Sequence, residues 1–485
     1  MHMKLADPLL LREQCYLDGA WCTADSGLTI NVINPSTDAI IGRVPRMGAT
    51  ETQRAIAAAQ AALPAWRALT AKERAARLQA WFRQIMAHQE DLAQIMTAEQ
   101  GKSLAESRGE IAFAAAYVEW YAEEGKRIYG DVIPSPQAGR RLIVTKEPIG
   151  VCAAITPWNF PAAMITRKAA PALAAGCTLV LKPASQTPFS ALALCVLAER
   201  AGIPRGVLSV VTGDSAAIGG ELTASPIVRK LSFTGSTPIG IKLLEQCAAT
   251  VKKVTLELGG NAPFIVFDDA DLEAAVEGAL IAKFRNAGQT CVCANRFFIQ
   301  DGIYERFVRR FAERVAQLVV GDGADADTQV GPMIDAKAVA GMVALVDQAQ
   351  AAGARLIIGG NRHARGGAFF EPTLLADVTA QMRVAQEEIF GPVAPIFRFT
   401  TEQEVIALAN DTEFGLACYV YARDLSRVWR VSEALEYGMV GVNVGVLATE
   451  VAPFGGVKSS GLGREGSRYG IEDYVEIKYV CLGIS

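Results

Sequence analysis

The chain has 485 residues, of which 51% are hydrophobic and 20% charged, and its formal net charge is −4. This length predicts two or three domains with large buried cores. The small negative charge gives no electrostatic reason to expect nucleic acid or an anionic membrane as a partner. No apolar run reaches the roughly 18 to 20 residues that a membrane-spanning helix needs.

Cysteine usage and the N-terminus indicate the compartment. The ten cysteines are scattered, and they form neither a CxxC pair nor a Cys/His cluster. This pattern is typical of reduced thiols, and it argues against a disulfide framework and against a metal site. The N-terminus lacks the charged-then-apolar order of a signal peptide, so the cytoplasm is the expected location.

Residues 50 to 127 are predicted to be helical. The segments Thr50–Gln53 and Thr70–Glu73 both match the capping-box pattern that begins helices. Apolar residues follow at helical spacing, for example at Leu78, Phe82 and Ile85.

From about residue 140, short β-branched runs alternate with helical runs, which predicts βαβ units and a doubly wound, largely parallel sheet. A second αβ region is expected from about Val254 to residue 460, with Asp271 capping a helix. The tail from Tyr474 alternates like a half-exposed strand. The expected buried strands are Ile149–Ile155, Thr178–Leu181, Val207–Val211, Val228–Phe233 and Phe264–Phe267.

Cys291 lies in a polar, glycine-bearing segment, and Glu257 stands directly before a Gly-Gly pair. A thiolate can attack a carbonyl carbon and form a covalent intermediate. A carboxylate within reach can then activate the water that releases the product. Most free cysteines are instead small buried hydrophobic residues, but the polar flanks of Cys291 favour a functional role.

The chain has only three histidines, His2, His88 and His363, and none lies in a segment that resembles a site. Cys–His and Ser–His–Asp catalysis therefore lack a base. A carboxylate is the expected general base, and Glu257 has the best context.

Two segments are candidate phosphate or ribose sites. In Phe233–Gly240 a glycine turn leads into a helix whose first turn holds Pro238, and free N–H groups at a helix start favour an anion. The segment matches neither GxGxxG nor the P-loop, so on its own it is a weak signal. Lys182 ends a predicted strand, where α/β sheets bind ligands, although a solvated lysine is an equally good interpretation.

Taken together, six motifs resemble the aldehyde dehydrogenase superfamily in order and spacing, from about residue 15 to the C-terminus. Two longer segments, Phe284–Arg296 and Pro453–Gly466, further resemble its succinate-semialdehyde dehydrogenase branch. The six motifs are Thr156–Pro161, Lys182–Ser185, Phe233–Ser236, Glu257–Gly260, Gly288–Cys291 and Glu387–Pro392.

The resemblance implies an α/β fold with three parts. A Rossmann-like cofactor domain would span residues 1–127 and 148–253, and a catalytic α/β domain would span 254–465. A small β flap for oligomerisation would combine 128–147 with 466–485. A homo-dimer or homo-tetramer is the implied assembly.

The resemblance also assigns catalytic roles. Cys291 would attack the aldehyde, while the Asn159 amide and the Cys291 N–H would stabilise the oxyanion, each contributing about 3 to 4 kcal/mol. Glu257 would activate the hydrolytic water. The alternative for Asn159 is a helix N-cap ahead of Pro161.

The implied cofactor is NADP+, with NAD+ as a weaker alternative. Many family members carry a glutamate at the position of Ser185, where it can hold the ribose hydroxyls of NAD+ and would repel a 2′-phosphate. Ser185 is neutral, and Lys182 adds positive charge; the alternative is that Ser185 only caps a turn. The implied cofactor-binding residues are Trp158, Lys182, Ser185, Gly235, Ser236, Leu258, Glu388 and Phe390.

The implied substrate is a short aldehyde with a distal carboxylate, first succinate semialdehyde. Arg167 and Arg285 match arginines that this branch uses for the carboxylate, and the alternative for each is a surface or structural ion pair. Thr449 and Phe454 are the other implied substrate-binding residues, and Thr449 is a candidate to replace the serine that the branch is expected to carry at position 448. Ala448 departs from the serine expected there, which leaves glutarate semialdehyde or another acid-aldehyde open.

Three further alternatives remain. A CoA-acylating dehydrogenase would use CoA in place of water, although Glu257 favours hydrolysis. A catalytically silent member would serve as a binding or structural protein. Cys293 is either a small packing residue or a redox partner of Cys291, in a strained and easily reduced disulfide.

Overall fold

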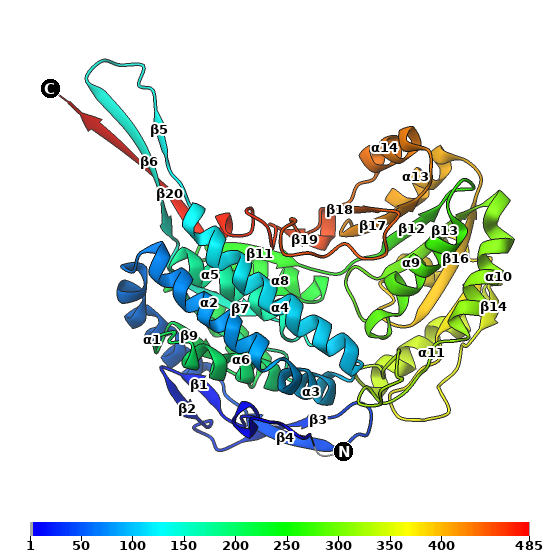
Figure 1. The fold of residues 1–485 in the computed structure, drawn as a ribbon, viewed down its shortest axis with the longest axis horizontal. Coiled ribbons are helices and arrows are strands. Elements are labelled where there is room, and N and C mark those ends of the chain that lie inside the picture. Colours follow the sequence, from blue (N-terminus) through cyan, green and yellow to red (C-terminus); the bar gives the residue numbers. More distant parts are fainter. Residues whose placement is uncertain (1–2, 485) are drawn as a thin grey trace.

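The structure is a computed structural model that describes residues 3–484. Two large sheets with flanking helices stand side by side, and a narrow β flap projects from one of them (Figure 1). None of the described helices is long and apolar enough to cross a membrane.

The first sheet has eight strands in the order β19-β11-β10-β7-β8-β9-β1-β2. Its five central strands are parallel, as the alternating pattern predicts. They are β11 (Lys253–Glu257), β10 (Val228–Thr234), β7 (Val151–Ile155), β8 (Thr178–Lys182) and β9 (Leu208–Val210). The edges are antiparallel and comprise β19 (Gly461–Leu462), β1 (Cys15–Leu17) and β2 (Ala20–Cys22).

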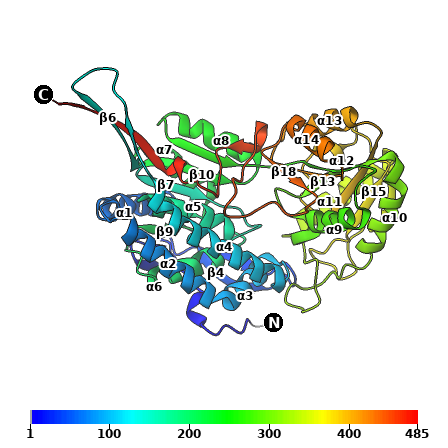
Figure 2. The ribbon, with the colours of Figure 1, turned by 45° about the horizontal axis from the view of Figure 1, so that its top comes forward.

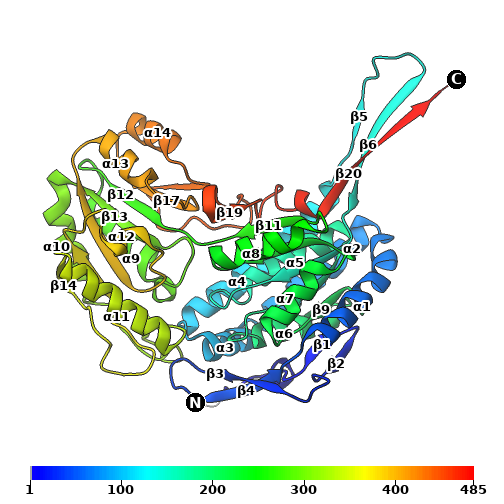
Figure 3. The same cartoon turned by 180° about the vertical axis from the view of Figure 1, so that it is seen from behind.

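Helices cover both faces of this sheet and bury a separate apolar core on each (Figure 3). One face carries α1 (Ala49–Arg67), α7 (Ser215–Ala224) and α8 (Thr237–Ala248). The other carries α2 (Ala71–Ala87), α3 (Gln89–Gln100), α4 (Leu104–Glu124), α5 (Ala163–Ala175) and α6 (Phe189–Arg200).

The second sheet has seven strands in the order β14-β15-β16-β13-β12-β17-β18, all parallel except β14. They are β14 (Arg355–Ile358), β15 (Thr373–Ala376), β16 (Val393–Phe399), β13 (Ala294–Gln300), β12 (Ala262–Val266), β17 (Ala417–Tyr421) and β18 (Met439–Val442). Its helices are α9 (Leu272–Phe284), α10 (Tyr304–Val315), α11 (Ala336–Ala351), α12 (Arg383–Gln386), α13 (Glu402–Asn410) and α14 (Leu425–Ala434).

The projecting flap is a three-stranded antiparallel sheet (Figure 2). Its strands are β5 (Asp131–Ile133), β6 (Arg140–Pro148) and β20 (Val475–Gly483). Two of its apolar side chains, Val132 and Ile477, are 76% and 70% exposed. The flap therefore presents an apolar surface and an unpaired strand edge to its surroundings.

The remaining elements are short. A two-stranded sheet of β3 (Thr29–Ile33) and β4 (Ile40–Pro45) lies near the N-terminus. The single-turn helices are η1 (Pro8–Leu10), η2 (Gly125–Arg127), η3 (Arg285–Gly288), η4 (Asp301–Ile303), η5 (Lys458–Ser460) and η6 (Glu472–Tyr474).

The capping predictions had mixed outcomes. Thr70 caps α2 and Asp271 caps α9, as predicted. The capping box predicted at Thr50 is wrong, because α1 begins at Ala49. The carboxylate of Glu51 instead accepts a hydrogen bond from the backbone N–H of Gly48 at 3.0 Å. The predicted domain boundaries stay a prediction, although the chain passes from the first sheet to the second between β11 and β12.

Candidate active site

Eight of the predicted site residues line one cavity of about 230 Å³. The cavity lies where β7, β10 and β11 end, next to the loops that follow α9 and α12. Ligands of parallel α/β sheets bind at this edge because the loops there diverge. The eight residues are Trp158, Asn159, Gly235, Ser236, Leu258, Cys291, Glu388 and Phe390.

The Cys291 loop begins with three consecutive residues in the left-handed region, Asn286 (φ 51°), Ala287 (φ 53°) and Gly288 (φ 75°). Non-glycine residues avoid this region, so the surrounding contacts must hold the turn. Gln289 supplies two of them: its Nε2 donates to the Asn286 carbonyl at 3.1 Å, and its Oε1 accepts from the Ile334 N–H at 2.8 Å. The loop that presents Cys291 is therefore fixed by buried hydrogen bonds.

Cys291 lines the first cavity and is intermediate in exposure. Burial raises its pKa to about 12, and the positive charge of Arg167 opposes that rise. The thiol form therefore dominates near neutral pH in the unliganded protein.

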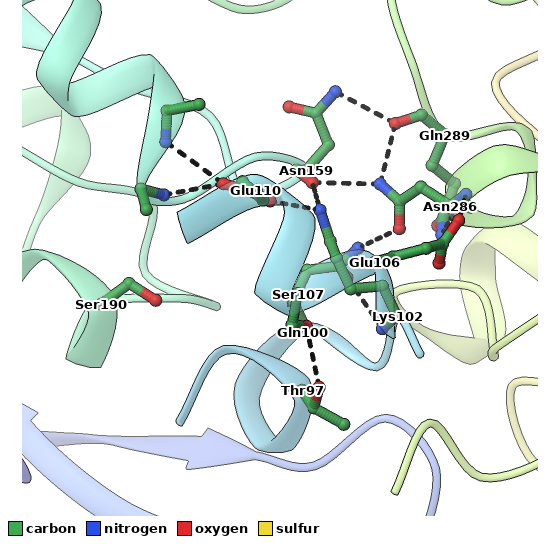
Figure 4. A network of polar contacts seen from close by, with 12 residues as sticks. Thr97, Gln100, Lys102, Glu106, Ser107, Glu110, Asn159, Ser190, Asn286 and Gln289 are labelled. Carbon is green, nitrogen blue, oxygen red and sulfur yellow. Dashed lines mark hydrogen bonds and ion pairs between the residues drawn. The ribbon is translucent and has the colours of Figure 1, made fainter. Parts of the chain in front are cut away.

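Asn159 follows β7, and both its side-chain amide and its main-chain carbonyl are hydrogen-bonded (Figure 4). Its side-chain Nδ2 donates to the Gln289 carbonyl at 3.0 Å, and its own carbonyl accepts from Lys102 Nζ at 2.7 Å. The alternative that Asn159 caps the next helix is wrong, because the N-cap of α5 is Ala162. The second amide hydrogen of Asn159 remains free to donate.

Glu257 ends β11 with its side chain buried, and neither carboxylate oxygen has a hydrogen-bond partner within residues 3–484. Burial, followed by the negative charge of Glu465, raises its pKa well above the ordinary value. Lys168 acts in the opposite direction; its Nζ contacts Glu465 and donates to Thr234 Oγ1 at 2.6 Å. The Glu257 carboxyl thus lies within the electrostatic influence of a buried ion pair.

A second cavity of about 300 Å³ adjoins the first, because Phe160 lines both. Arg285 and Ala448 also line it, and the Arg285 guanidinium lies 5.5 Å from the centroid of the Phe160 ring. Arg285 forms no ion pair with any described carboxylate. This cavity therefore has the Arg285 cation at one wall and the small Ala448 at another, and its lining also includes Lys102, Glu106 and Glu110.

Arg167, on α5, is 2% exposed and lies among aromatic rings. Its guanidinium carbon is 4.1 Å from the centroid of Phe454, 5.0 Å from Tyr117 and 5.2 Å from Phe113. No described carboxylate lies within ion-pair distance of it, and its Nε lacks a hydrogen-bond partner. A buried cation without a counter-ion is costly, so the site is complementary to an anionic ligand.

Thr449 lies beside this cluster, but its hydroxyl is already engaged. Its Oγ1 bonds with Glu450 Oε2 at 3.1 Å, and its carbonyl accepts from the Tyr117 hydroxyl at 3.4 Å. Thr449 therefore helps to place Tyr117 under Arg167.

Lys182 and Ser185 lie at the end of β8, outside the residues that line the first cavity. Lys182 is buried, and within residues 3–484 its Nζ donates only to the neighbouring Pro183 carbonyl, at 3.2 Å. Burial lowers the pKa of Lys182 to about 8. An ammonium with so few partners suits a ribose or phosphate oxygen.

The start of α8 is also open to a ligand. Ser236 is the N-cap and makes no side-chain capping bond, and Pro238 occupies the first turn. The uncapped N–H groups and the positive end of the helix dipole suit the pyrophosphate of a dinucleotide. The residues present thus fit a dinucleotide cofactor. No group of three His, Cys, Asp or Glu residues within 3–484 could hold a metal ion.

Comparison with known proteins identifies the family. The model of the "Aldehyde dehydrogenase family" matches residues 21–480. The chain belongs to the aldehyde dehydrogenase family. It is 66% identical over 481 residues to a glutarate-semialdehyde dehydrogenase of Pseudomonas aeruginosa, covering 99% of this chain and 100% of the relative.

Two further similarities are nearly as extensive. An Escherichia coli succinate-semialdehyde dehydrogenase [NADP(+)] is 65% identical over 482 residues, with 99% of this chain and 100% of that protein covered. The crystal structure of an E. coli NADP-dependent enzyme superimposes with a TM-score of 0.99 at 65% identity, covering 99% of this chain and 100% of that one.

Sequence reasoning missed several charged residues of this aldehyde dehydrogenase site. Lys102, Glu110, Lys168 and Glu465 are all buried beside the predicted catalytic residues. Lys102 and Glu110 come from the helical first third of the chain, which carried no site motif. The only available signal was the charged character of residues flanked by otherwise apolar helices.

Proposed function

We propose that this aldehyde dehydrogenase oxidises a short aldehyde with a distal carboxylate, with succinate semialdehyde as the first choice and NADP+ as the preferred oxidant. The buried, unpaired guanidinium of Arg167 is the observation that carries this proposal. The names of the relatives agree with it, since both cited proteins act on semialdehydes of dicarboxylic acids.

The substrate carboxylate pairs with Arg167 among its aromatic neighbours, and Arg285 attracts it from the adjoining cavity. Arginine suits this role because its planar fork binds a carboxylate bidentately, and the pairing strengthens where water is excluded. Binding also neutralises a buried charge that the protein leaves uncompensated.

The thiol of Cys291 first loses its proton to solvent, and the thiolate Sγ then attacks the aldehyde carbon. The oxygen of the aldehyde becomes an oxyanion that accepts from the Asn159 amide and the Cys291 N–H. These donors are already in place, so they stabilise the developing charge without reorganisation.

The dinucleotide is held by Lys182 and Ser185 at the end of β8, by Gly235 and Ser236 before α8, and by a group nearer Cys291. When bound, the dinucleotide would supply a hydride acceptor for the carbon attached to Cys291 Sγ, and a thioester would remain on Cys291. Ser185 places no negative charge near a 2′-phosphate, which supports NADP+ over NAD+. The group nearer Cys291 consists of Trp158, Leu258, Glu388 and Phe390.

Glu257 completes the cycle by taking a proton from the water that hydrolyses the thioester. Burial and the negative charge of Glu465 raise the pKa of Glu257 above its ordinary value, and this makes it a stronger base than an exposed carboxylate. The positive charge of Lys168, in its buried ion pair with Glu465, stabilises the carboxylate form of Glu257.

The best test is kcat/KM for a panel of succinate semialdehyde, glutarate semialdehyde and butyraldehyde with both cofactors. The proposal requires that both acid-aldehydes exceed butyraldehyde and that NADP+ exceed NAD+. Glutarate semialdehyde is the second candidate, because the small side chain of Ala448 leaves room in the second cavity. Equal or higher values for butyraldehyde would overturn the substrate class.

Product analysis separates the remaining alternatives. Formation of the free acid supports hydrolysis, whereas a requirement for CoA and formation of acyl-CoA would support the acylating alternative. A protein that reduces neither cofactor with any aldehyde would be a silent member.

We also propose a homo-dimer or homo-tetramer in the cytoplasm. The exposed apolar residues and free edge of the flap support self-association. All ten cysteines are free, which suits a reducing compartment.

A further inference from the structure

We propose that Lys102 is a positioning residue for the oxyanion site, because it holds the main chain of Asn159 in a fixed place. This inference rests on the proposed function of Asn159 as an oxyanion donor. Lys102 lies just before α4, far from every motif of the catalytic loop.

The Lys102 ammonium makes three contacts. Its Nζ donates to the Asn159 carbonyl at 2.7 Å and to Glu110 Oε2 at 2.5 Å. It also lies 3.9 Å from the centroid of the Phe160 ring. Both charged side chains are 1% exposed, so the ion pair is shielded from water. Figure 4 shows Lys102 between Glu110 and the Asn159 main chain.

Glu110 extends this support to the helix that carries Arg167. Its Oε1 accepts from the N–H groups of Ala162 and Ala163, at 2.9 and 3.2 Å, which begin α5. The ion pair therefore joins α4 to both the oxyanion loop and the start of α5.

A second set of hydrogen bonds involves the main-chain carbonyl of Asn159. Asn286 Nδ2 donates to the Asn159 carbonyl at 3.0 Å and to the Gln289 carbonyl at 3.2 Å. The Gln289 carbonyl also receives the Asn159 side chain. With Lys102 as the second donor, both lone pairs of the Asn159 carbonyl are used, so its peptide plane cannot rotate without breaking a buried bond.

This arrangement is more than packing. A buried ion pair contributes little net stability, since the cost of desolvation offsets the attraction. An apolar pair could fill the same space, but it could not hold the Asn159 carbonyl. Because a shift of about 1 Å in a reacting group can lower a rate roughly 100-fold, fixing that carbonyl has a direct kinetic consequence.

The test is a double-mutant cycle on the single-turnover rate of NADPH formation at saturating succinate semialdehyde. We expect Lys102→Met to lower this rate about 10- to 100-fold, with the dissociation constant for NADP+ changed less than about twofold. In an Asn159→Ala background, the same substitution should lower the rate by less than about twofold, because the two act through one group.

Lys230→Met is the matched control. Lys230 is also a fully buried lysine, on β10, and its Nζ donates to Thr255 Oγ1 at 2.9 Å. We expect Lys230→Met to lower Tm as Lys102→Met does, while its single-turnover rate stays within about twofold of the wild-type rate. Because Lys102→Met leaves Glu110 unpaired, Lys102→Met with Glu110→Gln provides a second variant without an uncompensated charge.

Each outcome has a distinct meaning. If Lys102→Met lowers the single-turnover rate equally in the wild-type and Asn159→Ala backgrounds, the positioning role is wrong. It is also wrong if Lys230→Met lowers the rate as much as Lys102→Met does. If Asn159→Ala itself leaves the rate unchanged, the oxyanion assignment in the proposed function fails instead. A normal rate in the paired variant would also overturn the role of Lys102.

Discussion

The guanidinium carbon of Arg167 lies 4.1 Å from the centroid of the Phe454 ring, and no described carboxylate pairs with it. The ring provides a cation–π contact but no hydrogen-bond acceptor, so the five donors of the guanidinium keep capacity for a ligand. This pair joins α5 of the first sheet to the C-terminal loop that precedes β19.

Arg167→Met should separate acid-aldehydes from neutral ones. A charge-assisted bond is worth about 2 kcal/mol, so kcat/KM for succinate semialdehyde should fall roughly 30-fold or more. Butyraldehyde has no carboxylate that could pair with Arg167, so its kcat/KM should change little and it provides the internal control. Equal losses on the two substrates would mean that Arg167 is structural.

Alkylation of Cys291 by iodoacetamide should report its raised pKa. Only the thiolate reacts, and its fraction rises about tenfold per pH unit below the pKa. The rate should therefore keep rising from pH 7 to pH 10, whereas an ordinary thiol levels off above about pH 9. Mass spectrometry of the Cys291 peptide measures this rate, and an early plateau would contradict the burial of the thiol.

Ser185→Glu should shift cofactor preference toward NAD+. The new carboxylate would repel a 2′-phosphate and could accept the ribose hydroxyls, so the ratio of kcat/KM for NADP+ over NAD+ should fall roughly tenfold. Ser185→Ala adds no charge and should change the ratio much less. If Ser185→Glu leaves the ratio unchanged, the 2′-phosphate is recognised elsewhere.

Cys293 should behave as a packing residue. Its side chain is buried, and its Sγ donates to the Lys283 carbonyl at 3.5 Å. Peroxide inactivation and recovery in dithiothreitol should therefore be the same in wild type and in Cys293→Ala. Recovery that is lost only in Cys293→Ala would support the alternative, a reversible disulfide with Cys291.

Local sequence patterns were sufficient to predict those site residues that lie at or near the ends of predicted strands. The strand patterns predicted β7, β8 and β10, and they placed Lys182 at a strand end. The structure adds Asn159 after β7 and Glu257 at the end of β11 to the same edge of the first sheet, although no strand ending at Glu257 was predicted. Parallel strands impose this arrangement, because their carboxyl ends meet at one edge.

Long-range partners could not be predicted in the same way. Lys102 precedes Asn159 by a whole helix and a flap, and nothing in its local pattern indicates burial against Glu110. The pairing of Lys168 with Glu465 likewise joins distant segments. Even the local pattern at Thr50 was misleading, because Gly48 can also begin a helix when Glu51 closes on its N–H.

Trapping a thioester on Cys291 tests whether the reaction passes through a covalent intermediate that Glu257 hydrolyses. Glu257→Gln removes the base that hydrolyses the thioester but keeps Cys291 and Asn159, so succinate semialdehyde and NADP+ should yield one burst of NADPH and then almost no turnover. Intact-mass and peptide spectrometry should then find a succinyl group on Cys291, which Cys291→Ala abolishes. Full steady-state turnover in Glu257→Gln, or acylation of another residue, would contradict the roles proposed for Glu257 and Cys291.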